Sequence, residues 1–214
     1  LDPSAVVGSL RAKTKSNYRA GKSKYFIVEA CEYRRDFLSL EPDILVITNL
    51  EHEHVDYYKD LTSVQEAFRE MANKVPEDGF VIANMTDPNV LPVLSGLKAT
   101  VVDYRKFFNP LRQLTMPGIH NQMNAAAAAT VASCLKIDPS DTEKALENFA
   151  GTWRRFEYKG AFVNDEGRVL VYDDYGHHPT EIRATITGTR ELYPDKELTL
   201  VFQSHTYSRT HELF

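Results

Sequence analysis

Residues 172–181 read Tyr-Asp-Asp-Tyr-Gly-His-His-Pro-Thr-Glu, and this stretch decides the fold class. Residues 168–171 before it form an apolar run typical of a strand, and residues 180–192 after it have the pattern of a helix. Pro179 suits a first helical turn, because the N–H that proline lacks has no helical partner there. Two Asp, two Tyr and two His therefore lie where a strand passes into a helix, which is where open parallel sheets bind ligands. The alternative is a polar loop with a hairpin-like kink.

Other apolar runs extend this alternation of strand and helix along the chain. Residues 25–28 and 44–47 are predicted to form strands buried on both faces, residues 198–202 are predicted to form a further buried strand, and other strands are expected at residues 80–83 and 100–102. Because the runs alternate with helical patterns, the chain is predicted to be an α/β protein with mainly parallel sheets.

Two helices between these strands have clear sequence signals. Ser63 and Glu66 have the spacing of a capping box, and apolar side chains recur on one helical face from there to residue 75. The alanine run at residues 125–129 predicts a second helix that continues to about residue 135. A charged and aromatic junction follows, so we predict two domains, residues 1–152 and residues 153–214.

Composition narrows the classes of function. The 214 residues are 43% hydrophobic and 26% charged, as in ordinary globular proteins, and the formal net charge is −5. Nucleic-acid binding needs positive potential, so it is not expected here. No run approaches the roughly 18 apolar residues of a membrane span. The first residues do not resemble a signal peptide, and we predict a cytoplasmic protein that does not bind membranes. The sequence leaves the oligomeric state open.

Five groups of polar side chains follow an apolar strand or begin a helix. They are Glu29; Glu51, Glu53 and His54; His120, Asn121 and Asn124; residues 173–178; and His205 with Arg209. Because the carboxyl ends of parallel strands lie on one edge of a sheet, we expect these groups to meet around one site.

The acidic and imidazole groups indicate a metal. Glu29 and His54 could share a divalent cation, since carboxylates suit Mg²⁺ and imidazole is common at transition metals. A plain surface carboxylate is the alternative for Glu29. The pair His177 and His178 also allows a zinc hydrolase, but adjacent side chains point apart and no further ligands have zinc-site spacing.

The amide, guanidinium and remaining carboxyl groups indicate a nucleotide. Asn121 and Asn124 share a helical face, where their amides could read the edge of a base, although N-capping by Asn121 is the alternative. Arg154 and Arg155 offer planar donors for phosphate oxygens, although a salt bridge is the alternative for each of them and is what we expect for Arg154. Asp174 could accept hydrogen bonds from ribose hydroxyls.

Six motifs in this order resemble the Mur ligases. They are residues 28–32, 47–56, 117–126, 151–157, 173–181 and 203–210. The most specific is Asp-Asp-Tyr-Gly-His-His-Pro-Thr-Glu at residues 173–181. The chain is similar to the central ATPase domain of that family followed by the opening of its Rossmann-like C-terminal domain.

The resemblance implies an ATP-dependent ligase that uses Mg²⁺ and joins L-alanine to UDP-N-acetylmuramate through an acyl phosphate, in peptidoglycan synthesis. By position, Glu29 and His54 match Mg²⁺ ligands, Asn121 and Asn124 adenine contacts, Arg155 a phosphate contact and Asp174 a ribose contact. Tyr175, His177, His205 and Arg209 match substrate contacts, and His54, Arg155, His205 and Arg209 are the expected catalytic groups.

The chain also departs from the family pattern. The phosphate loop Gly-Thr-x-Gly-Lys-Thr is not in these 214 residues, so we expect the chain to begin downstream of it and to bind ATP poorly. Glu53 replaces the usual Asp before the motif histidine, and a hairpin before Pro117 is expected to be trimmed. A tripeptide-adding recycling ligase and a degenerate, non-catalytic nucleotide-binding module remain alternatives.

Overall fold

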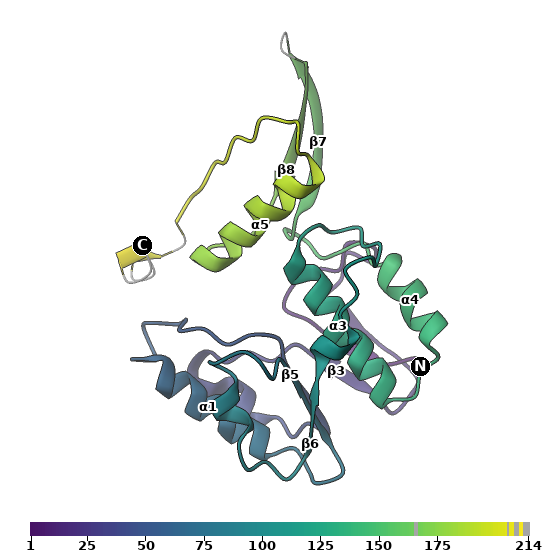
Figure 1. Cartoon of the computed structure of the whole chain (residues 1–214), viewed down its shortest axis with the longest axis vertical. Coiled ribbons are helices and arrows are strands. Elements are labelled where there is room, and N and C mark those ends of the chain that lie inside the picture. Colours follow the sequence, from purple (N-terminus) through teal and green to yellow (C-terminus); the bar gives the residue numbers. More distant parts are fainter. Residues whose placement is uncertain (165–166, 205, 208–209, 212–214) are drawn as a thin grey trace. The chain divides into compact units, whose positions relative to one another are not determined.

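The computed structural model describes residues 1–164, 167–204, 206–207 and 210–211 (Figure 1). Its contacts divide the chain into two compact units. The first unit comprises Leu1–Ala30, Thr115–Gly118 and Asn148–Val201, and the second comprises Cys31–Leu114, Ile119–Glu147 and Phe202–Phe214. Each unit combines three segments that are separated in the sequence. The division into domains between residues 152 and 153 stays a prediction.

A parallel sheet forms the centre of the second unit. Its strands are β4 (Ile44–Ile47), β5 (Phe80–Ala83) and β6 (Thr100–Asp103), in the order β4-β5-β6. Both strand pairs are parallel. Val81 and Ile82 in the middle strand are fully buried, which explains why this strand is a continuous apolar run. The predicted α/β class with mainly parallel pairing is confirmed here.

Helix α1 (Leu61–Asn73) shows which part of the helix prediction was wrong. The predicted apolar stripe is confirmed, because Val64 and Met71 are buried on one face. The cap differs, since the N-cap is Asp60, whose carboxylate accepts from the Ser63 backbone N–H at 2.8 Å. Ser63 therefore lies inside the first turn and closes the capping box with Asp60, not with Glu66.

The alanine-rich helix α3 (Ile119–Cys134) packs close to the sheet. Ala126 and Ala127 form a buried cluster with Ile82 of β5 and Tyr104, which begins the 3₁₀ helix η2 (Tyr104–Phe107). Short side chains let the helix approach the strand closely. The remaining elements of the unit are η1 (Tyr33–Ser39), α2 (Leu91–Leu94) and α4 (Pro139–Glu147).

The first unit begins with a small sheet in the order β2-β1-β3. Strand β1 (Ser4–Val6) pairs antiparallel with β2 (Tyr18–Arg19) and parallel with β3 (Phe26–Val28). The prediction that β3 is buried on both faces was wrong, because it is an edge strand and Phe26 is 60% exposed. An apolar run predicts burial only when neighbouring elements cover it.

A hairpin and a helix complete the first unit. Strands β7 (Glu157–Asn164) and β8 (Gly167–Asp173) pair antiparallel, because only two residues separate them and a parallel crossover needs a dozen or more. Figure 1 shows α5 (Pro179–Leu192) beside this hairpin. The predicted helix start is confirmed, since Pro179 occupies its first turn.

The predicted strand at residues 198–202 was wrong. The segment is extended but belongs to none of the sheets that the structure describes, and Val201 is 92% exposed. Its apolar pattern is real, but a strand also needs an edge with which to pair. Among the described helices, none is both long enough and apolar enough to cross a membrane.

Candidate functional site

Asp174 organises the loop between β8 and α5. Its Oδ1 accepts from the Gly176 N–H at 2.7 Å, and its Oδ2 accepts from the Phe156 N–H at 2.8 Å. The carboxylate therefore ties this loop to the junction at residues 151–157. Because a carboxylate offers about four lone-pair sites, two of them stay available for other donors.

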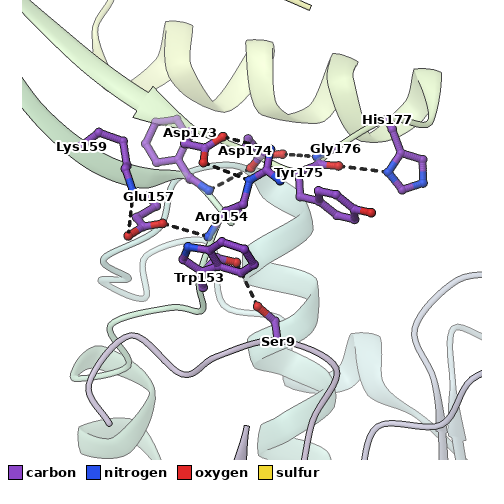
Figure 2. Close-up of polar contacts among 11 residues, drawn as sticks. Ser9, Trp153, Arg154, Glu157, Lys159, Asp173, Asp174, Tyr175, Gly176 and His177 are labelled. Atoms are coloured by element: carbon purple, nitrogen blue, oxygen red, sulfur yellow. Dashed lines mark hydrogen bonds and ion pairs between the residues drawn. The ribbon is translucent and has the colours of Figure 1, made fainter. Parts of the chain in front are cut away.

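Arg154 forms a second connection between the junction at residues 151–157 and the end of β8 with its following loop (Figure 2). Its Nε donates to Asp173 Oδ2 at 3.0 Å, and its carbonyl accepts from the Tyr175 N–H at 2.7 Å. The guanidinium also lies over the rings of Tyr175 and Trp153, 5.1 and 5.7 Å from their centroids. The predicted salt bridge of Arg154 is confirmed, and Arg155 is itself paired with Glu181, so its contact with a phosphate stays a prediction.

Glu181 holds the N-terminus of α5. Its Oε2 accepts from the backbone N–H groups of His177 at 3.0 Å and His178 at 3.3 Å, and Arg155 Nη1 lies 3.3 Å from Oε1. Burial raises the pKa of Glu181, but these donors and the Arg155 charge outweigh it and lower the pKa below its usual value. Arg155 is therefore positioned at a helix N-terminus, where phosphate groups are also favoured.

Tyr175 and His177 present their rings from this fixed loop. The rings meet edge to face with centroids 5.3 Å apart, and His177 Nδ1 lies 3.0 Å from the Tyr175 carbonyl oxygen. Tyr175 is 41% exposed. A hydroxyl and an imidazole on a rigid backbone can orient a polar substrate.

Residues 8–12 pack on the junction and bring Glu29 into the first unit's network. Ser9 Oγ donates to the Trp153 carbonyl at 3.0 Å, and the Trp153 N–H donates to the Leu10 carbonyl at 2.6 Å. The Gly8 N–H donates to Glu29 Oε2 at 2.6 Å. Glu29 directly follows β3, as predicted, and its carboxylate is oriented by this backbone donor.

His54 in the second unit has a partner that the sequence did not indicate. Its Nε2 lies 3.0 Å from Glu32 Oε1, and the Glu32 backbone is held by the Tyr58 hydroxyl, which donates to its carbonyl at 2.6 Å. The hydrogen bond from His54 lowers the pKa of the Glu32 carboxyl. One ligand atom from each of Glu32, Glu53 and His54 lies within 4.8 Å of the others. Carboxylates and an imidazole at this spacing fit a divalent cation.

Asn121 and Asn124 lie near the start of α3 and share a face. The helix begins at Ile119, so Asn121 is a helical residue, and the N-capping alternative was wrong. Its amide Nδ2 lies 3.1 Å from His120 Nε2. Asn124 is exposed, so its amide can donate and accept at once.

Two family models match the chain. The Mur ligase middle domain matches residues 11–108, and the Mur ligase, glutamate ligase domain matches residues 154–213. The chain belongs to the Mur ligase family.

Relatives of known name agree with this Mur ligase assignment. A UDP-N-acetylmuramate–L-alanine ligase of Clostridium tetani is 39% identical, over 100% of this chain and 52% of that protein. The structure of a UDP-N-acetylmuramate–alanine ligase from Thermotoga maritima matches with a TM-score of 0.76 at 25% identity, over 99% of this chain and 53% of the other. A murein peptide ligase from Psychrobacter arcticus matches with a TM-score of 0.66 at 22% identity, over 95% and 54%, and shows the fold alone. The chain thus spans about half the length of these relatives.

The Mur ligase residues predicted from the sequence fall in both units. The first unit contains Glu29, Arg155, Asp174, Tyr175 and His177, and the second contains His54, Asn121 and Asn124. Each unit is described by itself, so the shared cation of Glu29 and His54 stays a prediction. His205 and Arg209 lie outside the described residues. The sequence analysis did not assign Glu32 to the site, although Glu32 ends the motif at residues 28–32 and lies three residues after Glu29.

Proposed function

We propose that the natural polypeptide carrying this Mur ligase chain joins L-alanine to the carboxylate of UDP-N-acetylmuramate in peptidoglycan synthesis, at the expense of ATP. The observation that supports this most strongly is the 39% identity, over the whole chain, to a relative with that name. The activity belongs to the cytoplasm, where the nucleotide-linked substrates would be made.

The reaction class determines which groups the site must supply. The carboxylate is activated as an acyl phosphate, and the amine of the amino acid then displaces phosphate to leave an amide. Donors must orient the phosphate oxygens, and a general base must receive a proton from the amine. We assign phosphate orientation to Arg155 and substrate contacts to Tyr175 and His177, with His205 and Arg209 as further catalytic and substrate groups.

Mg²⁺ would be held by Glu29 and His54 in this proposal. The donor types suit a divalent cation, because Glu29 offers a carboxylate oriented by the Gly8 N–H, and His54 would offer Nε2 after release from Glu32. When bound, Mg²⁺ neutralises charge on the phosphate oxygens. Glu32 and Glu53 beside His54 offer additional oxygen ligands.

ATP would be recognised by groups from both units. Asn121 and Asn124 would contact the adenine with their amides. Asp174 would accept from the ribose hydroxyls through the lone pairs that its two backbone donors leave. Arg155 would turn from Glu181 towards phosphate, which is a modest change because both side chains are partly exposed.

An assay of the natural full-length polypeptide tests the proposal. Phosphate release is measured with UDP-N-acetylmuramate, ATP and Mg²⁺ in the presence of L-alanine, other amino acids or a tripeptide. We expect release with L-alanine and a product whose mass corresponds to one added alanine.

A tripeptide-adding ligase of the same family is the second candidate, because the murein peptide ligase has the same fold and the fold does not distinguish between amino acceptors. Preference for the tripeptide in this assay would establish it. Failure of every amino acceptor would favour a non-catalytic nucleotide-binding module.

A further inference from the structure

Arg112 is a buried charge for which the proposed chemistry has no use. Its side chain is 3% exposed. Nε and Nη2 donate to the two carboxylate oxygens of Glu143 in α4, each at 2.8 Å. Nη2 also lies 3.4 Å from the Phe107 carbonyl. This bidentate pair ties the segment after η2 to α4, and all of its members belong to the second unit.

The backbone of Arg112 makes a second connection, to α3. Gln122 Nε2 donates to the Arg112 carbonyl at 2.8 Å. Gln122 lies between Asn121 and Asn124, and successive residues in an α-helix are about 100° apart around the axis. The hydrogen bond from Gln122 therefore restrains the first turns of α3, which carry both asparagine amides.

The contacts of Arg112 with Glu143 and Gln122, here called the Arg112 clamp, are not optimised for stability. Among the described residues, Arg112 Nη1 and Gln122 Oε1 are buried atoms that have no hydrogen-bond partner. Buried polar atoms are normally paired, and leaving them unpaired costs stability. The Arg112 side chain is buried whereas that of Glu143 is 43% exposed, so water already solvates part of this ion pair and its net contribution to stability is small. A purely structural requirement would therefore be met as well by apolar residues.

We propose that Arg112 is a positioning residue for base recognition, acting through Gln122 on Asn121 and Asn124. This inference rests on the proposed function, because it requires that α3 contact a nucleotide. Amides fixed in direction distinguish adenine from guanine, since the two bases present opposite donors and acceptors on the same edge. Amides free to turn with the helix lose that discrimination.

The test compares ATP and GTP binding to the natural full-length polypeptide with its melting temperature. The double variant Arg112→Met/Glu143→Met removes both charges at once. We expect an equal or higher melting temperature, an ATP affinity lower by about 10- to 100-fold, and an ATP-to-GTP preference reduced towards one. The matched control, Arg35→Met/Glu70→Met, removes a partly exposed Arg–Glu pair of the same unit with a 3.1 Å separation and leaves the preference unchanged.

A second variant keeps the proposal testable if the double variant does not fold. Gln122→Leu leaves the Arg112–Glu143 pair intact and should lower the ATP-to-GTP preference in the same way. Equal loss of ATP and GTP affinity, or an unchanged preference in Gln122→Leu, would overturn the positioning role. A wild-type polypeptide that binds no nucleotide would instead refute the proposed function, and this inference with it.

Discussion

His54 shows how a single residue can match its motif and still have an unforeseen partner. Its position after β4 and its φ of 52° place the ring beside Glu32, 3.0 Å away. The left-handed backbone costs energy in a non-glycine residue, so it is retained only where surrounding contacts impose it. The motif indicated Glu29 as the partner, whereas only the coordinates show Glu32.

Glu29→Gln and His54→Gln test the metal assignment at the residue scale. Each removes a proposed Mg²⁺ ligand, so we expect ligase activity of the full-length polypeptide to fall by about 100-fold or more and the Mg²⁺ concentration for half activity to rise. Magnesium titration of the initial rate measures both effects. The exposed Glu41→Gln serves as the control, and variants that keep wild-type magnesium dependence would contradict the assignment.

Asp174→Asn tests the carboxylate that orders the β8–α5 loop. An amide keeps only one acceptor oxygen, so the N–H of Gly176 or Phe156 loses its partner. We expect the free energy of unfolding to drop by about 1–3 kcal/mol, measured by urea titration. Asp195→Asn, at an exposed position, should change it little. An unchanged unfolding curve for Asp174→Asn would show that these hydrogen bonds do not matter.

Helix α5 illustrates how local capping signals determine an element. Pro179 begins the helix, the His178 ring Nδ1 accepts from the Thr180 N–H at 3.2 Å, and Glu181 closes a capping box with the His178 backbone. All of these contacts span four residues or fewer, so the sequence could predict the start of α5. The start of α1 could not be predicted in the same way, because the spacing of polar residues allowed either Asp60 or Ser63 to be the N-cap.

The lowered pKa of Glu181 makes the stability of α5 dependent on pH. A carboxyl whose pKa is lower in the folded state stabilises it above the unfolded pKa, and this contribution is lost as the pH falls through the folded pKa. Glu181→Gln should therefore lower unfolding free energy at pH 7, and its difference from wild type should shrink below about pH 4.3. Urea unfolding at both pH values measures this. A difference that is constant with pH, or equal to that of the exposed Glu191→Gln, would exclude the effect.

At the scale of the whole molecule, the chain contains two units that each hold part of the predicted site. The family's phosphate loop, whose backbone N–H groups and lysine cradle phosphates, is not among the 214 residues. The chain spans about half the length of its relatives. The nucleotide affinity of these 214 residues is therefore expected to differ from that of the full-length polypeptide.

Isothermal titration of the 214-residue chain with MgATP tests this distinction. We expect binding weaker than millimolar, because the proposed contacts to the base and ribose would leave the phosphates without the donors of a phosphate loop. The full-length polypeptide is the positive comparison. Sub-millimolar affinity of the 214-residue chain would show that the loop is dispensable.

The sequence by itself determined the features that depend on near neighbours. These are the α/β class, the parallel strands of the second unit, the buried face of α1, the start of α5, and the family motifs. Tertiary structure alone decided that Glu32 faces His54, that Arg112 clamps α3 and α4, that β3 is exposed, and that residues 198–202 pair with none of the described strands. The physical reason is the distance along the sequence between the residues that interact. Periodicity and capping act over a few residues, whereas partners such as Arg112 and Glu143, 31 positions apart, meet only after the chain has folded.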